Sequence, residues 1–128
     1  MLQHTHGWML LLAAFVIGCG TTKLFDPLPP DLDRTVVPTQ TIDMTAENFH
    51  FTPEEIRVKE GTLVTLRVRA IEGTHGFSLG AFGIDELLEE NQTKVIEFYA
   101  AKKGEYTYRC SHFCGIGHFG MSGKIIIE

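Results

Sequence analysis

The chain has 128 residues, of which 44% are apolar and 21% are charged, and its formal net charge is −5. This length and composition are those of a single globular domain with one modest hydrophobic core. The negative balance leaves no basic surface to neutralise phosphates, so we expect no nucleic-acid partner.

Residues 1–18 are predicted to be an export segment. Their continuous apolar run at 10–17 is too short to span a bilayer comfortably, but it suits the core of a signal peptide. Residues 16–19 (Val-Ile-Gly-Cys) are similar to the lipobox of bacterial lipoproteins, in which the Cys is acylated, although no Lys or Arg precedes them. We therefore predict a membrane anchor, through acylated Cys19 or through an uncleaved short segment, with the domain facing the periplasm or cell exterior.

Residues 19–39 are predicted to be a Pro-rich tether. Four of the five prolines of the chain lie there, among Asp and Thr and without apolar periodicity. This composition favours an extended, semi-rigid spacer. We expect the segment to position the domain that follows it, residues 40–128, and to carry no chemistry.

Residues 40–128 are predicted to form an all-β domain. Strict alternation of apolar and polar residues at 62–70 and 93–100 is typical of half-buried strands. Shorter strands are expected at 41–46, 55–59, 76–79, 105–110 and 124–127, with Gly-containing turns between several of them. Short strands at this density favour a β-sandwich. Residues 85–91 are compatible with one helical turn, too short to define a layer.

A cluster of metal-binding residue types lies between the last two predicted strands. Cys110, Cys114, His118 and Met121 follow one another at intervals of four, four and three residues. Thiolate and thioether are soft donors, and imidazole suits copper, zinc and iron. Met121 favours copper, because zinc sites draw on Cys, His and carboxylate ligands.

A further imidazole is expected from outside this loop. His75 lies in a turn that leads into a predicted strand, from which it could meet the loop across the sandwich, so we predict that it binds the metal. His112 lies between the two cysteines, and we expect its side chain to point away while its carbonyl faces the metal. His4 and His6 belong to the export segment, and His50 is expected in an edge loop.

These residues resemble the CuA domain of cytochrome c oxidase subunit II, above all its short ba-type bacterial form. The resemblance is carried by the Cys-x3-Cys-x3-His-x2-Met loop, the Gly after the second Cys and the upstream His-Gly-Phe strand, and it covers about residues 40–128. It implies a cupredoxin-like Greek-key β-sandwich in which two thiolates bridge two copper ions. The ligands that it implies are the side chains of His75, Cys110, Cys114, His118 and Met121 and the carbonyl of His112.

The resemblance also implies one-electron transfer, from a c-type cytochrome or other small donor to a haem–copper oxidase or another terminal reductase. No nucleophile–base pair is evident, so we expect no catalytic residues. The chain is then expected to be an electron-transfer protein or an oxidase subunit without a catalytic site of its own. A periplasmic copper-binding or copper-delivery protein is the alternative, and Met121 disfavours a structural zinc or disulfide domain. The acidic stretch 85–90 could dock a basic cytochrome or could be a solvated face.

Two positions depart from the pattern of subunit II proteins. His112 stands where many members carry a Glu that contributes to a magnesium site, so we expect no magnesium. The only Trp is Trp8, in the export segment, so the exposed Trp at which cytochrome c docks on many members has no counterpart. Phe49, Phe51 or Phe82 could take that docking role, although a core position is favoured for each.

Overall fold

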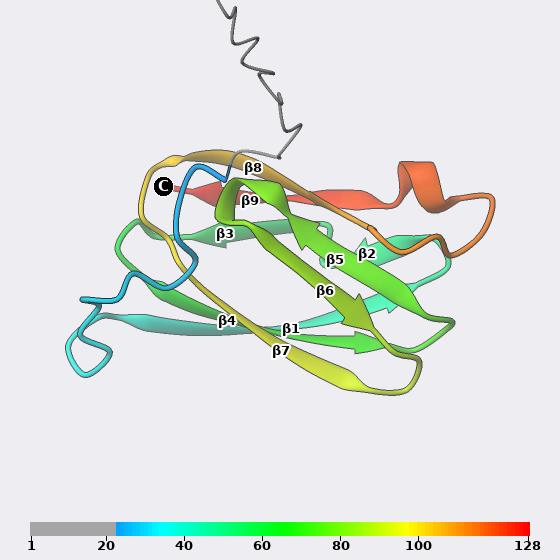
Figure 1. The fold of residues 1–128 in the computed structure, drawn as a ribbon, viewed down its shortest axis with the longest axis horizontal. Coiled ribbons are helices and arrows are strands. Elements are labelled where there is room, and N and C mark those ends of the chain that lie inside the picture. Colours follow the sequence, from blue (N-terminus) through cyan, green and yellow to red (C-terminus); the bar gives the residue numbers. More distant parts are fainter. Residues whose placement is uncertain (1–22) are drawn as a thin grey trace, which may run out of the picture.

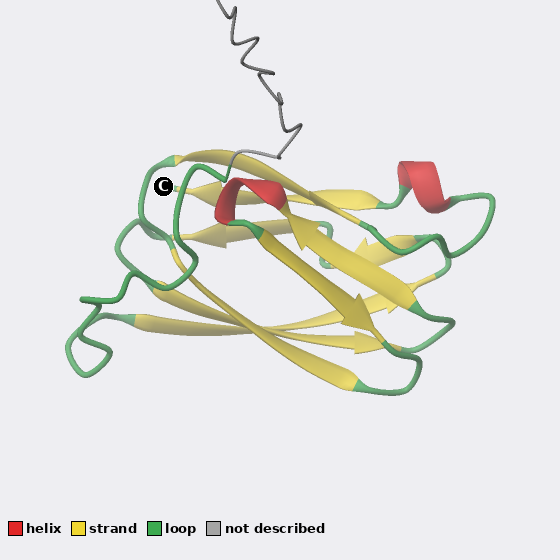
Figure 2. Ribbon diagram, in the orientation of Figure 1, coloured by secondary structure: helices red, strands yellow, loops and turns green. Residues whose placement is uncertain are grey.

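The computed structural model describes residues 23–128, so the predicted export segment and Cys19 lie outside the described residues. Within this range, nine strands and two short 3₁₀ turns form two sheets packed face to face (Figures 1 and 2). The predicted all-β sandwich is confirmed. None of the helices in the described range is long and apolar enough to cross a membrane.

The first sheet has the strand order β2-β1-β4-β7. Its strands are β1 (Thr39–Glu47), β2 (His50–Thr52), β4 (Leu63–Ala70) and β7 (Thr93–Tyr99). β1 runs parallel to β4, whereas β2 and β7 pair antiparallel to their neighbours. The alternation predicted for β4 is observed: Leu66 and Val68 are fully buried, while Arg67 and Arg69 are exposed.

The second sheet has the strand order β3-β9-β8-β5-β6. Its strands are β3 (Glu55–Val58), β5 (His75–Leu79), β6 (Ile84–Leu88), β8 (Gly104–Arg109) and β9 (Ser122–Ile127). β3 and β9 run parallel, and the other neighbours are antiparallel. The 3₁₀ turn η1 (Gly80–Phe82) links β5 to β6, and η2 (His118–Gly120) precedes β9.

Aromatic side chains fill the space between the sheets. Tyr108 stacks on Phe77 with ring centroids 5.0 Å apart, and Phe51 packs against Tyr108 at 5.2 Å. Phe51 and Phe82 are 1% and 0% exposed, so both belong to the core, and neither is available for docking a partner. Only Phe49, at 37% exposure, remains at the surface among the three phenylalanines considered for that role.

Two local expectations were wrong. The helical turn considered at 85–91 is largely replaced by strand β6, because Ile84 and Leu88 bury their side chains against the core and pair with the two ends of β5. Pairing with a neighbouring strand outweighs the helix propensity of the intervening acidic and leucine residues. Strand β2, with only three residues between two turns, was not expected, and it contains His50, which had been expected in a loop.

The described part of the predicted tether is docked on the sandwich. The amides of Leu24 and Phe25 donate to the carbonyl of Ala81 at 2.8 and 3.0 Å, and the Phe25 ring lies 5.2 Å from that of Phe82. The amide of Tyr99 in turn donates to the carbonyl of Pro27 at 2.7 Å. These residues therefore close one side of the domain. The division of the chain into export segment, tether and domain stays a prediction.

Three connections meet at the opposite end of β5. They are the β8–β9 loop (residues 110–121), the β4–β5 turn before His75, and the β1–β2 turn at residues 48–49. In Figure 1 the β8–β9 loop forms the orange projection at the right-hand end of the molecule. The fold therefore gathers parts of the chain that are far apart in sequence around the predicted donor residues.

Candidate metal centre

The ligand loop is closed at its base by the ladder between β8 and β9. Arg109 is paired with Ser122, and the amide of Cys110 donates to the carbonyl of Met121 at 2.9 Å. Cys110 and Met121 therefore continue the sheet into the loop, with exposures of 4% and 1%. The first and last donor residues of the loop are fixed by the scaffold, and Cys114 and His118 lie in the half-buried part between them.

Two free thiols form the middle of the site. Cys110 Sγ and Cys114 Sγ lie 3.6 Å apart, and neither cysteine is in a disulfide. The amide of Gly76 on β5 donates to Cys110 Sγ at 3.4 Å. The β8–β9 loop thus presents its sulfur pair directly to the neighbouring strand.

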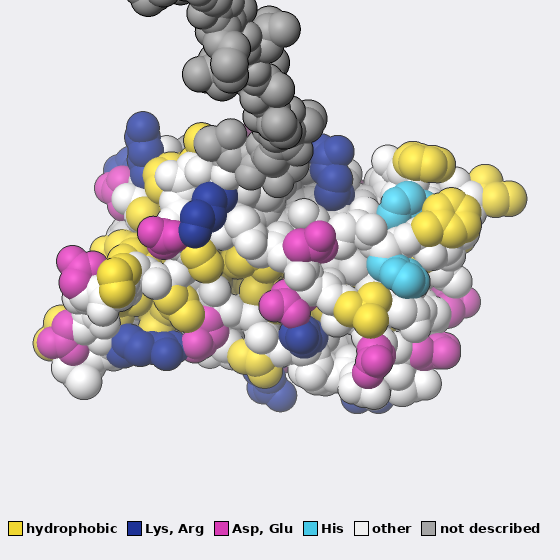
Figure 3. Space-filling model, in the orientation of Figure 1, with side chains coloured by type: hydrophobic (Ala, Val, Ile, Leu, Met, Phe, Trp, Pro, Cys, Tyr) yellow, Lys and Arg dark blue, Asp and Glu magenta, His cyan; other side chains and the backbone are white. Residues whose placement is uncertain are grey.

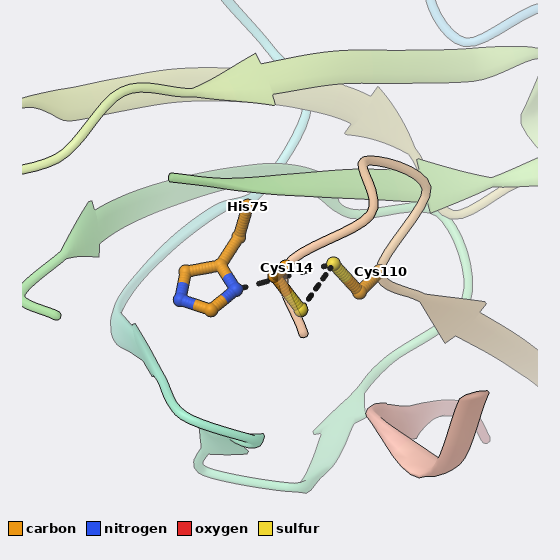
Figure 4. Close-up of side chains that lie close together, drawn as sticks. All are labelled: His75, Cys110 and Cys114. Carbon is orange, nitrogen blue, oxygen red and sulfur yellow. Dashed lines mark hydrogen bonds between the residues drawn. The ribbon is translucent and has the colours of Figure 1, made fainter. Parts of the chain in front are cut away.

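The imidazole of His75 comes from β5 and points toward the two sulfur atoms, as Figure 4 shows. Its Nε2 lies 2.6 Å from the carbonyl oxygen of Glu72, which can only accept, so Nε2 carries the proton. In the neutral ring Nδ1 is then the free donor, and it lies 4.0 Å from Cys110 Sγ. The side chain is fully buried, and its donor nitrogen lies within 4.8 Å of both sulfurs. A carbonyl that accepts a hydrogen bond from the other ring nitrogen is the usual means by which a metal-binding imidazole is oriented.

The other predicted donors lie around the same sulfurs. His118 Nδ1 is 3.7 Å and Met121 Sδ 3.9 Å from Cys114 Sγ. The carbonyl of His112 is 3.1 Å from Cys110 Sγ, while the His112 side chain is exposed. The structure therefore brings all six predicted site residues together. His50 instead has its Nε2 3.2 Å from a carboxylate oxygen of Glu47.

The Cys114 thiol needs a nearby cation to lose its proton at neutral pH. Burial, with a smaller contribution from the neighbouring Cys110, raises the pKa of the Cys114 thiol to about 11. A thiol with so high a pKa stays protonated at neutral pH unless a metal ion compensates the thiolate charge, and binding then releases the proton. Two thiols, a thioether, two imidazoles and a carbonyl form a soft donor set that suits copper, and the thioether is foreign to zinc sites.

Sequence reasoning missed the contacts that hold the loop against β5 and β6. A methyl group at Gly76 would overlap Ser111 Oγ and lie 2.6 Å from the amide nitrogen of His112, so only glycine allows this approach. Ser111 Oγ also donates to a carboxylate oxygen of Asp85 on β6 at 2.5 Å. The glycine that directly follows His75 was the one available signal of such a close approach.

The chain was compared with known proteins. The family model described as cupredoxin-like domain matches residues 9–127. Cytochrome c oxidase subunit 2 of Thermus thermophilus is 25% identical over 88 residues, which are 69% of this chain and 65% of that protein. Nitrous-oxide reductase of Stutzerimonas stutzeri is 34% identical over 89 residues, 66% of this chain but 14% of the reductase. The chain thus spans slightly less than two thirds of the first relative and a small part of the second.

A solved structure shares the fold. The periplasmic domain of subunit II of cytochrome oxidase (CoxB) of Bradyrhizobium japonicum superposes with a TM-score of 0.64 at 22% identity, over 69% of this chain and 83% of that one. The family match, the similarity to an oxidase subunit 2 and the soft donor set together support copper binding. The match over nearly the whole sequence shows that the chain belongs to the family of cupredoxin-like domains.

Proposed function

We propose that this chain is an electron-transfer domain with a binuclear copper centre, of the kind found in cytochrome c oxidase subunit II. The observation that carries the proposal is the pair of free thiols 3.6 Å apart, each with further donors beside it. The similarity to an oxidase subunit 2 supports the same reading. The proposed ligands are His75, Cys110, Cys114, His118, Met121 and the carbonyl of His112.

The distribution of donors favours two metal ions over one. Nδ1 of His75 and the carbonyl of His112 lie beside Cys110 Sγ, whereas Nδ1 of His118 and Sδ of Met121 lie beside Cys114 Sγ. A mononuclear blue-copper site uses a single Cys, two His and a weak axial ligand. The second Cys and the carbonyl exceed that set, and they would supply ligands for a second ion.

The scaffold suits electron transfer because it leaves the donors little freedom. Cys110 and Met121 are fixed by the β8–β9 ladder, and His75 by the carbonyl of Glu72. Copper, when bound, supplies a one-electron redox couple. Donors that are already in place keep rearrangement small when the charge of the centre changes, and burial of three of them keeps water away.

The partner is proposed to dock on the apolar tip of the ligand loop. Phe113, Ile116 and Phe119 are 67%, 97% and 90% exposed, and an exposed apolar cluster marks an interaction site. The rings of Phe113 and Phe119 lie 5.5 and 5.3 Å from the His118 ring. Figure 3 shows apolar and histidine side chains together at this end of the molecule. We propose a c-type cytochrome or similar small protein as donor and a haem–copper oxidase as acceptor.

The acidic stretch 85–90 is less suited to docking a basic cytochrome. Asp85 accepts from Ser111, Glu86 pairs with Lys94 at 2.7 Å, and Glu90 accepts from the amide of Gly73 at 3.2 Å. These carboxylates contact the ligand loop, strand β7 and the turn before His75. We therefore assign them structural contacts and place docking on the apolar tip.

The N-terminus is proposed to anchor the domain in the membrane, facing the periplasm or cell exterior. Leu24 and Phe25 attach the chain to Ala81 of the sandwich soon after Cys19 in sequence. This attachment supports an arrangement in which an anchor at Cys19 holds the domain close to the membrane. Globomycin-sensitive processing and palmitate labelling of the full chain test the lipid anchor. Labelling that persists in a Cys19→Ser variant would contradict it.

Copper stoichiometry tests the proposed function. The full chain with Cys19→Ser, which removes the third cysteine, is loaded with copper and analysed for metal after gel filtration. We expect two copper ions per chain that resist exchange with excess zinc. One labile Cu(I) per chain would favour the copper-delivery alternative, and preferential retention of zinc would contradict a copper function.

A further inference from the structure

The β1–β2 turn places a phenyl ring on the ligand loop. Phe49 lies in the turn that Glu47 and His50 close by pairing. A Cβ atom built on Gly115 would lie 2.9 Å from Cε1 and Cζ of the ring. One built on Gly117 would overlap Cγ and Cδ2 and lie 2.7 Å from the Phe49 Cβ. The ring therefore fills the space that side chains at both positions would need.

Gly117 shows that the ring, rather than the backbone, requires glycine there. Its φ of −81° and ψ of −1° are accessible to other residues, so an alanine would meet no conformational obstacle. Gly115, with φ of +133°, needs glycine for its conformation as well. Contact with Phe49 is thus the specific reason for glycine at position 117.

The segment under the ring connects two of the proposed ligands. Residues 115–117 join Cys114 to His118, and Ile116 between the glycines is 97% exposed. The loop is tied to the sheet at Cys110 and Met121, whereas this middle segment projects away from the ladder. A rigid ring packed directly on backbone, with no side chain between them, limits how far the segment can move.

The same turn also reaches the other side of the site. The side-chain oxygen of Asn48 would lie 3.6 Å from a Cβ atom on Gly73, in the turn that leads to His75. Residues 48 and 49 thus touch the surroundings of both imidazoles, although more than sixty residues separate Phe49 from Gly117 in sequence.

We propose that Phe49 is a positioning residue for the metal centre. Its ring holds residues 115–117 where Cys114 Sγ and His118 Nδ1 lie 3.7 Å apart. The effect of Phe49 on copper binding rests on the proposed function, whereas its contact with the ligand loop is present in the metal-free chain. We expect loss of the ring to loosen the donor residues. A methyl group added at Gly117, beneath the ring, should displace them.

Four variants of the full chain test the proposal: Gly117→Ala, Phe49→Ala, the double variant, and Gly120→Ala as the matched control. Apart from its two neighbours in the chain and the backbone of its own turn, a Cβ at Gly120 meets no atom of residues 23–128 within 4 Å, so this variant adds the same methyl to the same loop in open space. We expect Gly117→Ala to bind copper about 10–100-fold more weakly and to shift the thiolate-to-copper absorption. Gly120→Ala should match the parent, and the double variant should return to the affinity of Phe49→Ala alone.

Amide hydrogen exchange in the metal-free chain supplies a readout that does not depend on copper. Phe49→Ala is expected to speed exchange at residues 115–118 about tenfold, Phe49→Leu by less, and neither should change exchange in β4 and β8. The proposal is overturned if exchange in the loop stays at the parental rate. It is also overturned if Gly117→Ala behaves like Gly120→Ala or if removing Phe49 fails to rescue Gly117→Ala. A parent that binds no copper would refute the proposed function, while the exchange rates would still decide the role of Phe49.

Discussion

The two ends of β5 are closed by different chemistry. Beyond Leu79, Phe25 from the N-terminal segment packs against Phe82 and Tyr106 at 5.2 and 5.9 Å, an aromatic closure that is complete without a ligand. Before β5, the closure consists of sulfur, imidazole and carbonyl donors gathered around two free thiols. One end of β5 therefore supplies stability, and the other end supplies a site.

The largest effect is expected from loss of a central sulfur. Cys110→Ser should abolish the two-copper centre, because an alcohol is a far poorer soft donor than a thiolate. The copper content and the visible spectrum of loaded protein measure this. The fold should persist, since the change is nearly isosteric, and circular dichroism checks it. A variant that keeps two copper ions and the parental spectrum would remove Cys110 from the site.

The next largest effect lies at the aromatic end. Phe82→Ala should lower the free energy of unfolding by about 3–5 kcal/mol, because it empties a fully buried position. Urea unfolding of metal-free protein measures the loss. Below the unfolding transition, the copper spectrum should remain parental. A changed spectrum in the folded variant would show that the two ends are coupled.

Removal of the docked N-terminal ring should cost less. Phe25→Ala is expected to destabilise the metal-free domain by about 1–3 kcal/mol, because the ring is only partly buried. Leu28→Ala, at a residue 39% exposed in the same segment, is the control with a smaller expected loss. If both variants unfold at the parental urea midpoint, the N-terminal segment contributes nothing to the closure of this end.

Met121→Leu should separate ligation from packing. Both side chains are apolar and of similar volume, so the loss of stability should stay below about 1.5 kcal/mol. The reduction potential of the copper centre should nevertheless shift, since a donor sulfur is removed. Met44→Leu, at a buried core position in β1, is the matched control and should leave the potential unchanged. An unshifted potential in Met121→Leu would exclude Met121 from the ligand set.

The smallest effect on stability is expected at the exposed tip. Phe119→Ser should change the free energy of unfolding by less than about 0.5 kcal/mol. It should slow electron transfer from a c-type cytochrome, at a cost of about 1 kcal/mol or more in docking. Val95→Ser, at a residue 58% exposed on β7, controls for loss of an exposed apolar side chain elsewhere. Equal stopped-flow rates for the two variants would refute docking at the tip.

The sequence predicted those elements in which a single local pattern decides the structure. Alternation of apolar and polar residues was sufficient to predict strands β4 and β7. The spacing of the donor residues was sufficient to predict that the loop binds a metal. β6 was misjudged because Ile84 and Leu88, four residues apart, suit one face of a helix as well as the two ends of a strand. Only pairing with β5, which the residue pattern of β6 alone does not record, decides between the two structures.

Contacts between distant segments escaped prediction for the same reason. Phe25 is a lone aromatic residue among prolines, and nothing nearby in sequence indicates that Phe82 and Tyr106 receive its ring. The contact of Phe49 with the glycines of the ligand loop likewise arises only when the β1–β2 turn meets the β8–β9 loop. His75 was predicted from its position beside a turn and strand, and its carbonyl partner Glu72 became visible only in the fold.

Electron paramagnetic resonance of the half-reduced, copper-loaded chain tests the central claim most directly. Two copper ions held by the same two thiolates should share one unpaired electron. The account therefore predicts hyperfine splitting from two equivalent copper nuclei, together with two copper ions per chain. The four-donor set of a single site would instead confine the electron to one nucleus. A spectrum of one copper nucleus, at one copper ion per chain, would contradict the binuclear centre.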